Sequence, residues 1–171
     1  YFGNGRSPGK LGSAHPRNAP YQAFHAKDGY FAIAAGNHKL WLDVLGVVKK
    51  PELAQDPRFV STTDRATNQA ALKEILESVF VTQRVAYWID AFNTAGVPHA
   101  RINDYAAALA DPQTAHMGWV QPLELPNGKK TQTFASPIRL NGQSLPIRRS
   151  PPGLGQHTEE IRARLATKEA S

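Results

Sequence analysis

The sequence predicts an α+β fold, a small antiparallel sheet with several helices. Two turn signals, Asp28-Gly29 and Pro126-Asn127-Gly128, each lie between short stretches suited to β-strands and so predict two hairpins. Between the hairpins, apolar residues recur at the spacing of a helix with one buried face. A chain of 171 residues can bury a core around such elements without disulfide cross-links.

The first hairpin follows an arm that is poor in regular structure. Seven glycines and prolines within residues 1–20 discourage any helix or strand there. Tyr21–Ala26 is then expected to pair with residues 30–35, and a positive φ in the Asp28-Gly29 turn is expected to reverse the chain.

Two helical segments are predicted directly after this hairpin. Asn37 can cap a helix over residues 37–45, which Gly46 is expected to end. Pro51 suits the first turn of a short helix that runs through Ala54.

Two longer amphipathic helices are predicted in the middle of the chain. An apolar stripe from Leu72 to Phe80 marks the first, and such a stripe is typical of a core-facing surface. Thr82 is expected to cap the second, whose apolar face includes Trp88 and which Gly96 ends.

The last third predicts shorter elements. Residues 99–103 are expected to form a strand, and Asp104 to cap the alanine-rich turn that follows it. Pro112 can open a short helix. The second hairpin pairs residues 119–125 with Lys130–Phe134, and residues 138–140 can add a short strand.

The chain is therefore divided into three parts. These are a connecting arm with a pocket loop (1–20), a small α+β domain (21–140) and a carboxy-terminal segment (141–171). In the last part a loop over residues 141–155 precedes a helix capped by Thr158. Its thin apolar face predicts docking on a body outside this chain.

Composition excludes several classes of protein. The sequence has no cysteine, so it can form no disulfide and no thiolate metal site. It has no apolar run near the roughly 20 residues that cross a bilayer, so we expect no membrane partner. A cytoplasmic location fits the cysteine-free composition. The net charge is +6, but the basic carboxy-terminal third contains no aromatic residue after Phe134, so nucleic-acid binding is disfavoured.

The sequence offers no clear catalytic group of its own. The six histidines show neither an i,i+4 pair nor a His-Glu-x-x-His motif, so no metal site is predicted. The Gly-x-Ser-x-Gly spacing occurs at residues 5–9, but the glycines and prolines around it predict neither the strand nor the helix that a nucleophile elbow joins. Most acidic residues fall in turns, at caps or on polar helix faces, and we expect no catalytic acid in this chain.

Motifs spread over nearly the whole chain resemble one known family, the family III CoA-transferases (the CaiB/BaiF family). This family holds formyl-CoA and carnitine CoA-transferases together with α-methylacyl-CoA racemases. The resemblance rests on the order and spacing of residues 12–41, Asp56-Pro57-Arg58-Phe59, Arg65 with Asn68, Ala95-Gly96-Val97-Pro98, Asp104, Asp111-Pro112-Gln113, Ser136-Pro137-Ile138 and residues 151–158.

The resemblance implies an activity and places the chemistry outside this chain. The transferases of the family move CoA from an acyl-CoA to a carboxylic acid through an aspartyl-CoA thioester, and family members form interlocked homodimers. Their nucleophilic Asp and most CoA-binding residues belong to an amino-terminal Rossmann-like half, whereas this chain matches the carboxy-terminal half. The coenzyme A thioester is a substrate, and no covalently bound cofactor is implied. We therefore expect the 171-residue chain alone to be inactive.

The resemblance also implies a substrate-binding loop. His15, Arg17 and Asn18 fall where the transferases have a mobile, often glycine-rich loop over the reacting carboxylate, although this sequence departs from the glycine-rich form. His15 and Asn18 can hydrogen-bond an acyl group, and Arg17 can pair with a carboxylate. Equally, the three residues can simply brace the loop. Tyr21 and Trp41 are expected in the core.

Two alternative functions stay open at this stage. One is an α-methylacyl-CoA racemase or a related CoA-ester isomerase of the same fold, which would need a His and Asp pair outside this chain. The other is a binding or assembly module without catalysis.

Overall fold

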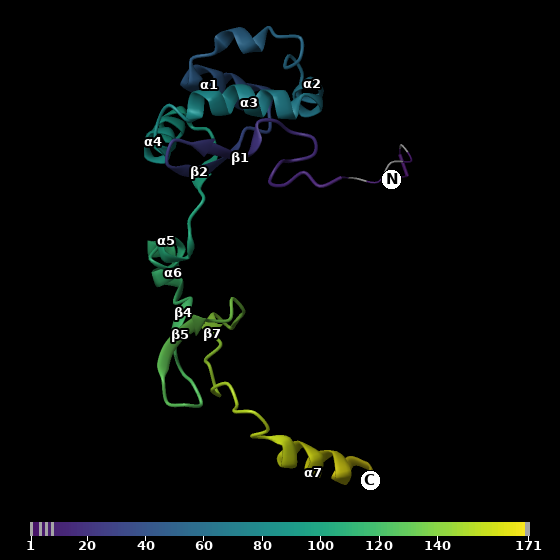
Figure 1. The fold of residues 1–171 in the computed structure, drawn as a ribbon, viewed down its shortest axis with the longest axis vertical. Coiled ribbons are helices and arrows are strands. Elements are labelled where there is room, and N and C mark those ends of the chain that lie inside the picture. Colours follow the sequence, from purple (N-terminus) through teal and green to yellow (C-terminus); the bar gives the residue numbers. More distant parts are fainter. Residues whose placement is uncertain (1, 4, 6, 8, 170–171) are drawn as a thin grey trace. The chain divides into compact units, whose positions relative to one another are not determined.

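The computed structural model describes residues 2–3, 5, 7 and 9–169 (Figure 1). It contains helices and small antiparallel sheets, so the predicted α+β class is confirmed. The chain forms two compact units, residues 1–102 and 103–171. The three-part division at residues 20 and 140 stays a prediction about the complete protein.

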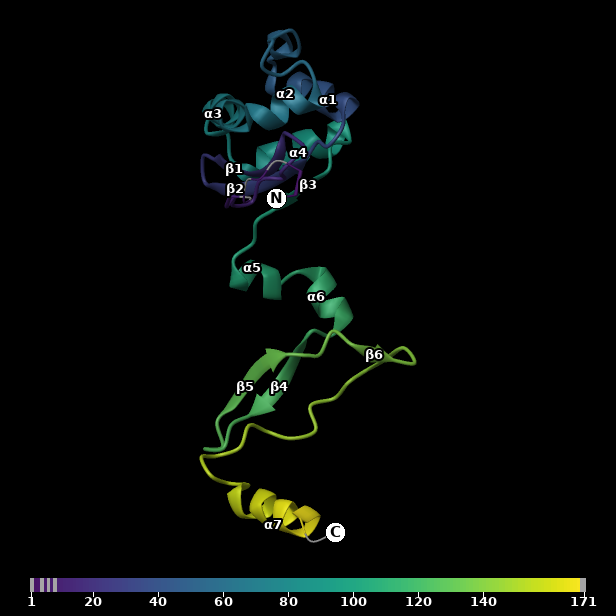
Figure 2. The same cartoon turned by 90° about the vertical axis from the view of Figure 1, so that its right-hand side faces the viewer.

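The first unit is built on a three-stranded antiparallel sheet with β2 in the centre (Figure 2). Its strands are β1 (Tyr21–Ala26), β2 (Gly29–Ala34) and β3 (His99–Arg101). Phe24 of β1 lies opposite Phe31 of β2, so large side chains gather on one face of the sheet.

The turn between β1 and β2 differs from the prediction. Gly29 belongs to β2, and no residue of the turn has a positive φ. Instead, Lys27 N–H donates to the Gln83 carbonyl at 3.0 Å, and Asp28 Oδ1 accepts the Val85 N–H at 2.7 Å. These bonds to a distant segment hold the reversal, so it does not need the left-handed geometry that sequence alone suggests.

Helix α1 (His38–Val48) begins at the predicted cap, where Asn37 Oδ1 accepts the Leu40 N–H at 2.9 Å. The prediction that Gly46 ends it is wrong. The helix continues because Val48 extends its buried face, and it stops at Lys49, which adopts φ 55°.

The remaining helices of this unit follow in close succession. They are the 3₁₀ helix η1 (Pro51–Ala54), α2 (Thr62–Thr67), α3 (Gln69–Phe80) and α4 (Val85–Ala95). The expected Thr82 cap on α4 is wrong, because Arg84 precedes the helix and the capping oxygen comes from Asp28 in the hairpin turn.

A cluster of aromatic rings joins the helices to the inner face of the sheet. Phe80 is its centre, with ring centroids 5.0 Å from Phe31 and Trp88, 5.4 Å from Phe24 and 6.0 Å from Phe92. All four contacts are edge-to-face, the favoured geometry for aromatic pairs. The helices of this unit cover only this face of the sheet (Figure 2), and we call the opposite face of the sheet the open face.

The second unit has a different character. It consists of α5 (Tyr105–Leu109), α6 (Pro112–Met117), β4 (Val120–Glu124), β5 (Lys130–Phe134), β6 (Arg139–Leu140), β7 (Gln143–Ser144) and α7 (Thr158–Glu169). None of residues 103–166 is fully buried, and Phe134 and Leu154 are among its exposed apolar side chains. These residues therefore form no core of their own.

Two details of this unit differ from the prediction. Strand β7 lies within the stretch expected to be a loop, because Asn141 and Gly142, with φ 51° and 77°, form a two-residue hairpin turn from β6. Thr158 is the first residue of α7 and not the residue before it.

The Asp28 cap predicts a measurable loss of stability. Removing its carboxylate in Asp28→Ala leaves the Val85 N–H without its acceptor and should lower the free energy of unfolding by about 1 kcal/mol. Asp28→Asn keeps an acceptor oxygen and should lose less than half of that. Urea denaturation followed by circular dichroism measures both. Equal losses in the two variants would show that the charge, and not the cap, matters.

The capping box of α2 predicts a pH dependence. Hydrogen bonds from the Ser61 hydroxyl and N–H hold the pKa of Asp64 below its ordinary value. Because the pKa is lower in the folded state, the stabilisation is complete above the unfolded pKa and is lost as pH falls through the folded one. The gap in thermal midpoint between wild type and Asp64→Asn should be constant from about pH 7 to 5 and shrink below about pH 4. A gap unchanged at lower pH would contradict this.

Candidate functional site

The residues proposed from sequence for substrate binding lie together, in the loop before β1. His15 N–H donates to the Tyr21 carbonyl at 2.9 Å, and Ala23 N–H donates to Ser13 Oγ at 3.1 Å. On the other side, Ala35 N–H donates to the Pro20 carbonyl at 2.9 Å. These bonds fix both ends of the 15–18 loop against the sheet.

The His15 ring folds the loop back on itself. Its Nδ1 accepts the backbone N–H groups of Arg17 and Asn18, each at 3.1 Å. The ring also stacks on Tyr21, with centroids 5.1 Å apart and an interplanar angle of 22°. Because Nδ1 accepts hydrogen bonds from two backbone N–H groups, the ring hydrogen lies on Nε2. Only the Nε2–H of this side chain is left for a ligand.

The other two predicted residues differ in exposure. Arg17 is exposed, whereas Asn18 is half-buried. A Cβ atom at Gly36 would lie 3.6 Å from Asn18 Nδ2, so the amide packs on the start of the segment that caps α1. The loop therefore presents the Arg17 guanidinium to solvent while Asn18 faces the protein.

Of the two aromatic residues expected in the core, only one is there. Trp41 is completely buried, and the Arg65 guanidinium lies over it, with Arg65 Cζ 5.3 Å from the centroid of the Trp41 ring. The prediction for Tyr21 is wrong, since 40% of its surface is exposed. Tyr21 is on the open face of the sheet because β-strand side chains alternate and its neighbour Gln22 faces inward.

Sequence reasoning missed two residues that hold this loop from the helical side. Gln69 donates from Nε2 to the carbonyls of His15 and Asn18, at 2.9 and 3.3 Å. Arg65 donates from Nε to the Ala19 carbonyl at 3.0 Å. Arg65 was visible as part of a family motif, but nothing in the sequence connects it to a carbonyl 46 positions earlier.

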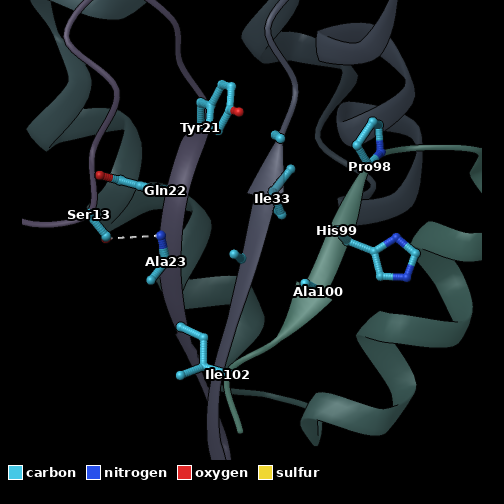
Figure 3. Close-up of a pocket in the computed structure, with 11 residues that line it drawn as sticks. Ser13, Tyr21, Gln22, Ala23, Ile33, Pro98, His99, Ala100 and Ile102 are labelled. Carbon is cyan, nitrogen blue, oxygen red and sulfur yellow. Dashed lines mark hydrogen bonds between the residues drawn. The ribbon is translucent and has the colours of Figure 1, made fainter. Parts of the chain in front are cut away.

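A shallow apolar depression of about 330 Å³ lies beside the loop on the open face of the sheet (Figure 3). Its floor is made by small side chains that face outward from the three strands, among them Ala23, Ala32 and Ala100. Tyr21 and Ile102 stand at its edge. The sequence carries a signal for this apolar face, namely the alanines themselves. Because side chains alternate along a strand, alanines two positions apart lie on the same face of the sheet.

The shifted carboxyl groups have structural partners. Hydrogen bonds from the Arg58 side chain and backbone hold the pKa of Asp56 below its ordinary value, with Arg58 Nη2 2.8 Å from Asp56 Oδ2. Hydrogen bonds from Ser61 likewise hold the pKa of Asp64 below its ordinary value. A general acid needs a raised pKa, so neither group suits that role. The described residues also contain no cluster of three potential metal ligands and no helix long and apolar enough to cross a membrane.

The chain belongs to CoA-transferase family III, because the sequence model of that family matches residues 1–158. An acetyl-CoA:oxalate CoA-transferase of Acetobacter aceti is 35% identical over 167 residues, which cover 97% of this chain and 42% of that protein. The succinyl-CoA:glutarate CoA-transferase of Homo sapiens is 34% identical over 152 residues, covering 89% and 35%. The family resemblance read from the sequence is thus confirmed.

A solved structure supports the same assignment. The crystal structure of a CAIB/BAIF family protein from Brucella suis superposes with a TM-score of 0.72 and 34% identity, covering 96% of this chain and 42% of that one. The chain therefore spans 35 to 42% of the length of these relatives.

The geometry of His15 predicts different behaviour for two substitutions. His15→Ala removes the acceptor of two amides, so exchange in residues 12–21 should accelerate roughly tenfold. His15→Asn should stay close to wild type, because an Asn oxygen can accept the N–H two residues later in an Asx-turn. Hydrogen–deuterium exchange mass spectrometry measures both. Equal acceleration in the two variants would mean that the ring stacking on Tyr21, and not Nδ1, orders the loop.

Proposed function

We propose that the complete protein transfers CoA from an acyl-CoA to a carboxylic acid and that this chain forms one wall of the acid-binding pocket. Family membership supports the reaction class. The observation that carries the role of this chain is the 15–18 loop, which is tied down by hydrogen bonds yet exposes one cation, Arg17. A rigid loop with one exposed guanidinium suits recognition of a carboxylate.

The loop offers two kinds of contact to an acid. Arg17 can bind a carboxylate in a bidentate manner, and the Nε2–H of His15 can donate one further hydrogen bond. Asn18 supports the loop from the protein side. A loop held over the reacting group would also keep water away from a reactive acyl intermediate.

We propose that the accepting acid carries two carboxyl groups. The relatives from Acetobacter aceti and Homo sapiens are named for oxalate and glutarate, which are both dicarboxylic acids. In transfer to a dicarboxylic acid, one carboxylate reacts and the other keeps its charge throughout. In this proposal Arg17 binds the carboxylate that does not react.

The covalent step belongs, in this proposal, to residues outside the chain. CoA passes through a thioester with an Asp that lies outside residues 1–171, and the acyl-CoA itself is a substrate. The second unit contributes surface to this larger protein, because exposed apolar side chains such as Phe134 and Leu154 need a partner. We propose that it docks on the amino-terminal half and that the complete enzyme is a cytoplasmic homodimer.

The reaction is tested by trapping. The complete protein, incubated with acyl-CoA and hydroxylamine, should show by mass spectrometry one modified Asp outside this chain, and the 171-residue chain should transfer no CoA. An unmodified protein that instead exchanges the α-proton of a 2-methylacyl-CoA would establish the racemase. A complete protein with neither activity would leave only the non-catalytic module.

The role of Arg17 is tested by comparing acids. Arg17→Ala in the complete protein should raise KM about tenfold or more for dicarboxylic acids, since a charged hydrogen bond is lost. For monocarboxylic acids the change should be less than about threefold. Arg84→Ala, which removes another exposed cation, is the matched control. A KM that rises equally for both kinds of acid would contradict the role given to Arg17.

A further inference from the structure

The 15–18 loop has no regular secondary structure, yet most of its backbone groups are bound. The N–H groups of Arg17 and Asn18 go to the His15 ring. The carbonyls of His15 and Asn18 go to one atom, Gln69 Nε2. One partner, the His15 ring, is thus part of the loop. The other partner, the Gln69 side chain, lies more than fifty positions later in the sequence.

Gln69 is well placed to bind the two loop carbonyls. It is the first residue of α3, and its side chain is half-buried between the helix and the loop. Because both of its partners are carbonyl oxygens, the amide nitrogen must face the loop. One amide thereby fixes the distance between the two ends of the turn that exposes Arg17.

A second residue anchors the chain immediately after the loop. Arg65 is completely buried, and its guanidinium donates to the carbonyls of Phe59 and Val60 at 3.0 and 3.3 Å and to that of Ala19 at 3.0 Å. Because the guanidinium is planar and its donors form a fixed fork, the bonds to residues 59 and 60 determine where the Ala19 carbonyl must lie. The carbonyls of His15, Asn18 and Ala19 therefore tie the loop and the residue after it to the helical layer.

We propose that Gln69 is a positioning residue for acid binding: with Arg65 as the anchor, it holds the 15–18 loop in the shape that presents Arg17 to the carboxylate. The inference rests on the proposed function, in which Arg17 binds the acid. Gln69 itself touches the loop backbone and is expected to act only through it. It should therefore affect the binding of the acid more than the turnover of bound substrate.

The test uses Gln69→Met in the complete protein. Methionine has a similar length and no charge but cannot donate a hydrogen bond, so the two loop carbonyls lose their partner. Exchange in a peptide covering residues 12–21 should accelerate roughly tenfold, and KM for a dicarboxylic acid should rise by about five- to tenfold with kcat changed less than about twofold. Gln55→Met, at an exposed position of the same unit, is the matched control and should change neither quantity.

A double variant separates positioning from a general loss of structure. If Gln69 acts through Arg17, Gln69→Met should raise KM no further once Arg17→Ala is present. Additive effects of the two substitutions would overturn the proposal, as would wild-type exchange in Gln69→Met. Accelerated exchange with an unchanged KM would overturn it too, while leaving CoA transfer intact. If the complete protein transfers no CoA, the proposed function fails, and the link between Gln69 and acid binding fails with it. The exchange result then still shows whether Gln69 holds the 15–18 loop in place.

Discussion

The buried guanidinium of Arg65 connects the parts of the first unit. It binds carbonyls from the arm before β1 and from the segment before α2, and it lies over the ring of Trp41 in α1. Burial lowers the pKa of this guanidinium from its ordinary value, and the charge of Asp64 opposes the shift. A buried cation must have its donors bound, so these segments are held around it.

The sheet next to this anchor has two different faces. The helical face carries the aromatic cluster around Phe80, and the open face carries small side chains and the exposed ring of Tyr21. The same ring stacks on His15, so the loop and the open face form one continuous surface. A candidate binding surface thus lies next to the rigid core, and the packing of that core fixes the shape of the surface.

Much of the fold and some of the site could be predicted from local patterns. Asn37 and Asp104 cap their helices through partners near in sequence, and both caps were predicted. The end of α1 could not be predicted from Gly46, because burial of Val48 outweighs the low helix propensity of glycine. The turn at Asp28 was also predicted wrongly, since its partners, Gln83 and Val85, lie just before α4 and at its first residue.

By itself, the sequence determined the α+β class, the family and the loop that contains His15, Arg17 and Asn18, because these depend on periodicity and motif order along the chain. Only the tertiary structure decided which atoms of that loop are free to meet a ligand. His15 Nδ1 is occupied by backbone N–H groups, and Gln69 reaches the loop from α3. The physical reason is that hydrogen-bond partners are selected by proximity in the folded chain, which residue order does not disclose.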